Sequence, residues 1–104
     1  MAGTLTVIWW RDIPAQVIAR DRREAHKVVL HPRFQVAIDK AAMKAVLKAA
    51  SDYIGEWRRE ASAFGEDLEA VAIAEATRLE GHYTKAVLHR LIAAGGLDAE
   101  PLPA

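Results

Sequence analysis

Runs of apolar, β-branched and aromatic residues, separated by proline and polar residues, recur along the first third of the chain, which is typical of β-strands. The pattern predicts strands over Thr4–Trp10, Gln16–Arg20 and Glu24–Leu30. The first strand carries apolar side chains on both of its faces, so we expect it at the centre of the sheet. Pro14 has no amide proton to give to a sheet, and residues 21–23 are all polar, so both mark turns.

From Pro32 onward the apolar residues recur every three or four positions, as in amphipathic helices. The spacing predicts a helix over Pro32–Ala49, a short helix over Ser51–Glu60 and a long helix over Glu66–Ala94, with a linker at 61–65. Such a helix must overhang the domain, bend at Gly81 or lie on another chain, and glycine in a helix interior costs about 1 kcal/mol relative to alanine.

Together these elements predict a single α+β domain over residues 1–96 and a loose C-terminal tail over 97–104. The expected architecture is a small three-stranded antiparallel sheet with helices packed on one face and a long C-terminal helix. A helix over Glu66–Ala94 would be about 43 Å long, whereas a domain of this size is about 26–30 Å across. We therefore expect this helix to pack on another protein or on a second copy of the chain.

Charge is balanced over the whole chain but not along it. The 14 Lys and Arg equal the 14 Asp and Glu in number. Residues 1–48 hold nine bases and four acids, a net charge of +5, and residues 49–104 hold five bases and ten acids, a net charge of −5. Either the two halves attract each other in the fold, or one meets a partner of opposite charge. Nucleic acid is not an expected partner, because its binders are usually basic overall.

The composition also narrows the chemistry. The chain has no cysteine, which excludes disulfides and thiolate chemistry. Its four histidines, at positions 26, 31, 82 and 89, match no recognised metal-ligand spacing, so neither a metal nor a cofactor is expected. No signal peptide and no membrane-spanning run is expected either, which favours a cytoplasmic location.

Residues 9–14 form the first candidate site. We expect Trp10 to be buried, because an exposed indole would leave a sticky patch on the surface. Arg11 and Asp12 could form a functional pair in which Arg11 binds a carboxylate or phosphate. In the structural alternative, Asp12 caps the turn at Pro14 and Arg11 packs on an indole.

The basic hairpin expected between the second and third strands is a second candidate. Four positive side chains gather there and could hold an anionic small molecule: Arg20, Arg22, Arg23 and Lys27. In the alternative interpretation they form a solvated hairpin tip that protects a strand edge. A lysine stripe in the first predicted helix is likewise either solvated or a contact for an acidic partner: Lys40, Lys44 and Lys48.

Several sequence runs carry a family resemblance: WRDIPAQV at 10–17, FQVAIDKAAM at 34–43, YIGEWR at 53–58 and LHRLIAAGG at 88–96. They resemble the small bacterial family known as "virulence factor", which is related to the C-terminal domain of the conserved virulence factor C proteins. Trp9 departs from the Tyr that is commonest there. The structural signature of the resemblance consists of Trp9, Trp10, Pro14, Phe34 and Trp57.

The resemblance implies little about the molecular mechanism, because the family name comes from a phenotype and not from a reaction. It also implies an association with genes for folate-linked and corrinoid-linked methyl transfer. We therefore expect a non-enzymatic accessory or protein-interaction module, with no catalytic residue. One alternative is an accessory subunit in folate- or corrinoid-dependent one-carbon metabolism, with an anionic metabolite as ligand. The other is a small enzyme that uses Arg11, Asp12 and His26.

Overall fold

Four strands form one antiparallel sheet in the computed structural model, which describes residues 3–45, 53–65 and 67–97. The strands are β1 (Gly3–Trp10), β2 (Ile13–Asp21), β3 (Glu24–Val29) and β4 (Trp57–Phe64). They lie in the order β3-β2-β1-β4, and each neighbouring pair is antiparallel. The first strand is therefore central, as its two apolar faces predict.

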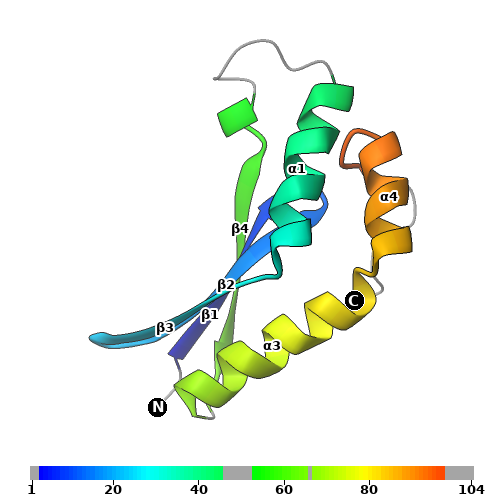
Figure 1. The fold of residues 1–104 in the computed structure, drawn as a ribbon. Coiled ribbons are helices and arrows are strands. Elements are labelled where there is room, and N and C mark those ends of the chain that lie inside the picture. The colour runs from blue at the N-terminus through cyan, green and yellow to red at the C-terminus, as the bar shows by residue number, and fades with distance from the viewer. Residues whose placement is uncertain (1–2, 46–52, 66, 98–104) are drawn as a thin grey trace.

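Among the described residues, helices lie on one side of this sheet, where α3 (Leu68–His82) and α1 (Pro32–Lys44) contact its strands and α4 (Lys85–Ala93) packs on α1. Helix α3 crosses β2 and β3, whereas α1 packs against α4 beside the hairpin that joins β1 to β2 (Figure 1). The prediction of an α+β fold with one antiparallel sheet is thus confirmed. None of the described helices combines the length and apolar character needed to cross a membrane.

Each helix begins where a side chain satisfies a free backbone amide. His31 precedes Pro32, and its Nδ1 atom accepts a hydrogen bond from the Arg33 amide at 3.1 Å. The carboxylate of Asp67 accepts from the Ala70 amide at the start of α3. The hydroxyl of Thr84 accepts from the Val87 amide at the start of α4.

The sheet has four strands rather than the three that the sequence pattern predicts. The short helix predicted over Ser51–Glu60 and the linker at 61–65 are wrong for residues 57–64, which form β4. This strand pairs with the open edge of β1, from Trp10 opposite Trp57 to Gly3 opposite Phe64. Pairing across the sheet overrides the local helical preference of its Arg, Glu and Ala residues. Residues 46–52, where two predicted helices meet, lie outside the described residues.

The long C-terminal helix predicted over Glu66–Ala94 is also wrong, because α3 ends at His82 and α4 begins at Lys85. The break falls after Gly81, at Tyr83 and Thr84. Tyr83 is 2% exposed and packs edge-on against Trp9, with ring centroids 5.9 Å apart. Burial of this ring turns the chain, and Thr84 then caps a new helix. The expected partner contact through one long helix loses its geometric basis.

The core lies between the sheet and the helices, and it is centred on the end of the β1–β2 hairpin. Trp10 is 0% exposed, and its indole Nε1 donates to the Tyr53 carbonyl at 3.0 Å. The Tyr53 ring stacks on this indole at 5.6 Å. Other fully buried side chains come from strand β2 and from each of the helices α1, α3 and α4: Ile13, Phe34, Ile38, Leu79 and Leu91.

Replacement of Trp10 tests how much of the stability this core supplies. Trp10→Ala should lower the free energy of unfolding by about 3–5 kcal/mol, because it removes a fully buried indole and leaves a cavity. Trp10→Phe should lower it by less, because an aromatic ring remains while the Tyr53 carbonyl loses its donor. Urea unfolding followed by circular dichroism measures both, and an unchanged midpoint for Trp10→Ala would contradict this account of the core.

Candidate functional site

Arg11 and Asp12 form the turn between β1 and β2, and backbone hydrogen bonds hold this turn from two sides. The Arg11 amide donates to the Glu56 carbonyl at 3.1 Å, and the Asp12 amide donates to the Gly96 carbonyl at 2.8 Å. Arg11 has a φ of 51°, a left-handed conformation that is unfavourable for a residue with a side chain. The turn therefore joins the approach to β4 with the end of α4.

The Arg11 side chain makes its contacts inside the domain. Its Nη1 donates to the Gly95 carbonyl at 2.9 Å, and its Nη2 lies 3.3 Å from Glu56 Oε1. The guanidinium lies 5.3 Å from the centre of the Trp10 ring, and 14% of the side chain is exposed. Arg11 thus packs on an indole and binds the C-terminal end of α4, where carbonyls favour a cation.

Asp12 binds Arg58, a residue that the sequence argument does not single out. Arg58 Nη2 lies 3.1 Å from Asp12 Oδ1, and Arg58 Nε donates to the Arg11 carbonyl at 3.1 Å. The same guanidinium contacts Glu60 and lies 5.0 Å from the centre of the Trp9 ring. Arg58 stands in the YIGEWR run, so that motif was the signal for its role. We call this arrangement of Arg11, Asp12, Arg58 and Gly96 the hairpin clasp.

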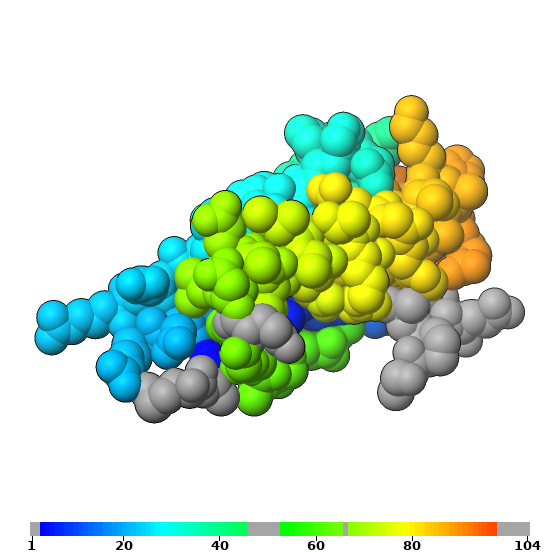
Figure 2. Space-filling view, turned by 90° about the horizontal axis from the view of Figure 1, so that it is seen from below, coloured from blue at the N-terminus to red at the C-terminus, as the bar shows by residue number. Residues whose placement is uncertain are grey.

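The basic hairpin between β2 and β3 projects from one end of the domain (Figures 1 and 2). Arg22 and Arg23 form its turn and line an open hollow of about 620 Å³. Three carboxylates share that lining and offset the two cations: Asp21, Glu24 and Asp67. An anion would therefore meet opposing charges at the tip.

Arg20 and Lys27, the other two residues of the basic hairpin, lie on the sheet face away from the helices. Val17 and Ala19 are 0% exposed beneath the helices, so Arg20 points to the opposite face by strand alternation. Lys27 stands opposite Ile18 and shares that outer face. The four positive side chains are thus divided between a turn and a sheet face.

The residues proposed for a small enzyme also lie apart. Arg11 and Asp12 are at one end of β2, whereas His26 stands opposite Ala19, near the other end of that strand. General acid–base chemistry needs groups within hydrogen-bond reach of one substrate. This arrangement does not supply such a group of three.

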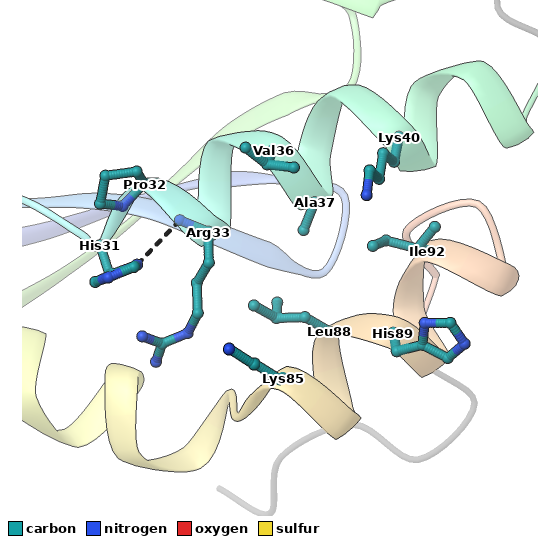
Figure 3. A pocket seen from close by; sticks show the side chains of 10 residues that line it. All are labelled: His31, Pro32, Arg33, Val36, Ala37, Lys40, Lys85, Leu88, His89 and Ile92. Carbon is teal, nitrogen blue, oxygen red and sulfur yellow. Dashed lines mark hydrogen bonds between the residues drawn. The ribbon is translucent and has the colours of Figure 1, made fainter.

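A groove between α1 and α4 brings together side chains that the sequence argument leaves separate. It has a volume of about 380 Å³ and is shown in Figure 3. Apolar residues form part of its lining: Val36, Ala37, Leu88 and Ile92. The lining also holds three cationic side chains and two histidines: Arg33, Lys40, Lys85, His31 and His89. No Asp or Glu is among the described lining residues, so the groove presents positive charge around an apolar surface.

The cations of the groove come from both of its walls. Arg33 is fixed by bonds from its Nη2 to the carbonyls of Glu80 and Tyr83, at 2.9 and 3.4 Å. In Figure 3 Arg33 and Lys40 come from α1 and Lys85 comes from α4, and Lys40 points from α1 toward α4. Like charges held near one another in a partly apolar groove repel each other, and an anion placed between them relieves that repulsion.

The sequence argument names Lys40 as a possible contact for an acidic partner but misses the rest of this groove. The second wall of the groove is α4, which the sequence prediction merges with α3 into one long helix. The threonine at position 84, followed by a helical run, was the available signal for a separate helix. Lys44 is exposed near the end of α1, outside the lining, and Lys48 falls outside the described residues.

The fold and groove define a small α+β domain with a four-stranded antiparallel sheet and a positively charged cleft between two helices. The chain belongs to the virulence factor family, since the model of that family matches residues 8–92. The match includes β1 from Ile8 onward and all ten residues that line the groove. Of the hairpin clasp it includes Arg11, Asp12 and Arg58 but not Gly96. Comparison with curated proteins and with solved structures finds no match.

Two glycine substitutions test the close approach on which the hairpin clasp depends. A Cβ atom at Gly96 would lie 2.7 Å from Cζ3 of Trp10, and Gly96 has a φ of 91°. Gly96→Ala should therefore destabilise the fold by roughly 1–3 kcal/mol. Gly81→Ala is the matched control, because Gly81 is helical with open space around it and should gain up to about 1 kcal/mol. Equal midpoints for the two variants in urea unfolding would refute the predicted close contact.

Proposed function

We propose that the chain is a non-enzymatic interaction module whose groove between α1 and α4 binds an acidic, amphipathic helix of a partner protein. One observation carries the proposal: three cationic side chains, two histidines and four apolar residues line the groove, and no described acidic residue joins them. The basic residues select a negatively charged partner, and the apolar residues favour one with a hydrophobic face.

The apolar part of this surface continues beyond the groove along α1. Val36 is 49% exposed and Met43 is 72% exposed. Positions 36, 40 and 43 follow helical spacing, so these side chains share one face of α1 with Lys40. A helix of the partner can place its apolar side chains along this stripe and its carboxylates against Lys40, Arg33 and Lys85. Exposed apolar side chains next to charges are typical of surfaces that bind other proteins.

The role in one-carbon metabolism names a different occupant for a cationic surface, a folate polyglutamate. Such a ligand also joins an apolar ring system to carboxylates, so charge alone does not separate the two ideas. The exposed stripe on α1 favours the helix, because the apolar side chains of Val36 and Met43 recur at the spacing with which a partner helix presents its own apolar face.

Fluorescence anisotropy with a labelled peptide tests this proposal. The probe is an amphipathic helical peptide with Leu on one face and Glu on the other. Binding should weaken about tenfold or more in a Lys40→Glu/Lys85→Glu variant, because two attractions become repulsions, and wild-type binding should fall as salt rises. An Arg20→Glu/Lys27→Glu variant is the matched control, since it changes net charge equally on the outer sheet face.

The comparison between variants decides which idea holds. Equal loss of binding in both double variants would show attraction by net charge alone and would contradict a site in the groove. Absence of peptide binding together with tight binding of a folate polyglutamate would replace the protein partner with the metabolite. Val36→Ser should also weaken peptide binding, because Val36 supplies exposed apolar contact at little structural cost.

A further inference from the structure

Strand β4 is an edge of the sheet that no described element covers. It pairs with β1 on one side only, and it is the last strand in the order β3-β2-β1-β4. Its residues from Arg58 to Ala63 are all exposed. Its pairing with β1 runs without a bulge from Gly3 opposite Phe64 to Trp10 opposite Trp57. A regular exposed edge presents a row of backbone donors and acceptors to another strand.

The register shows which backbone groups of β4 face outward. The Arg11 amide bonds to the Glu56 carbonyl, which continues the register of the β1–β4 pairs by one step. In an antiparallel ladder, alternate residues point their amide and carbonyl groups at the same neighbour. Residues 56, 58, 60 and 62 therefore face β1, and residues 57, 59, 61 and 63 present their N–H and C=O groups to the open side.

We infer that two copies of this chain pair through β4, antiparallel and about a twofold axis at Ala61, to form one continuous eight-stranded sheet. In this register Ala61 stands opposite Ala61 of the second copy, and Arg59 stands opposite Ala63. The outward-facing groups of one copy then meet those of the other. The resulting interface is isologous and closed, so assembly stops at two copies.

Charge along β4 selects this register over its neighbours. An axis at Arg59 would place two arginines directly opposite each other, and an axis at Glu60 would do the same with two glutamates, which is destabilising. An axis at Ser62 avoids this but pairs only residues 60–64 of the strand. The axis at Ala61 pairs residues 58–64 and sets Glu60 opposite Ser62.

Side chains at the ends of the paired segment also fit this register. Trp57 stands opposite Gly65 of the second copy, where a Cβ atom would meet nothing within 4 Å. An aromatic ring that covers a glycine on a neighbouring strand stabilises sheet pairing.

A proline substitution tests the pairing by light scattering. The wild-type chain should have the mass of a dimer. Ala61→Pro should have half that mass and remain folded, because the amide at 61 faces outward and edge strands tolerate proline there. Ala61→Thr is the matched control, since it keeps the amide and suits a strand, and it should stay dimeric. A monomeric wild type at the highest soluble concentration, or a dimeric Ala61→Pro, would overturn the inference.

A cysteine substitution tests the register and still decides the matter if Ala61→Pro fails to fold. The chain has no cysteine, so any disulfide must join two copies. Paired Cα atoms at the axis would lie about 5.5 Å apart, within the usual range for a disulfide. Ala61→Cys should cross-link rapidly under mild oxidation. Ala63→Cys should cross-link slowly, because its two Cα atoms would lie roughly 14 Å apart. Equal rates would exclude the proposed axis.

The tests of β4 pairing are independent of the proposed groove function, because β4 contributes no residue to the described lining of the groove. Loss of peptide binding with an intact dimer would contradict the proposed function alone. A monomeric chain that binds the peptide would contradict the β4 pairing alone.

Discussion

The hydrogen bond from the Asp12 amide to the Gly96 carbonyl is the contact on which the arrangement of the helices depends. Together with the bond from Arg11 Nη1 to the Gly95 carbonyl, it fixes the end of α4 to the β1–β2 hairpin. The bond from the Arg11 amide to the Glu56 carbonyl fixes the approach to β4 on the other side of the same turn. One short turn thus joins segments that are far apart in sequence. Because α1 packs on α4, the groove between them takes its shape from this turn.

The hairpin clasp also explains why two tryptophans, a charge pair and a proline stand close together at residues 9–14. Gly96 adopts a φ of 91° and lies against the Trp10 ring, where a side chain would not fit. Arg11 covers the other part of that indole and pairs with Glu56. Each of these residues has a geometric task inside the domain. Arg11 and Asp12 thus make their printed contacts inside the domain, and the partner surface that we propose lies on the helices.

Local patterns predict the parts of the fold that are determined locally. The apolar residues on both faces of the run 4–10 predict a central strand, and the helical spacing after Pro32 predicts α1. Strand β4 is missed because its Arg, Glu and Ala residues favour a helix, and only the open edge of β1 makes it a strand. The break at Tyr83 is missed because burial of that ring against Trp9 is a tertiary contact. The groove is missed for the same reason, since it needs the relative placement of two helices.

Native-state hydrogen exchange at Asp12 tests the role of the clasp most directly. The chain supplies its own reference, because Arg22–Arg23 is a turn of the same length between β2 and β3, and its first residue also has a positive φ, 56° against 51° for Arg11. The account predicts that the Asp12 amide exchanges only through global unfolding, as slowly as the amides of β1, while the Arg23 amide exchanges fast. Fast exchange at Asp12, comparable to that at Arg23, would contradict it.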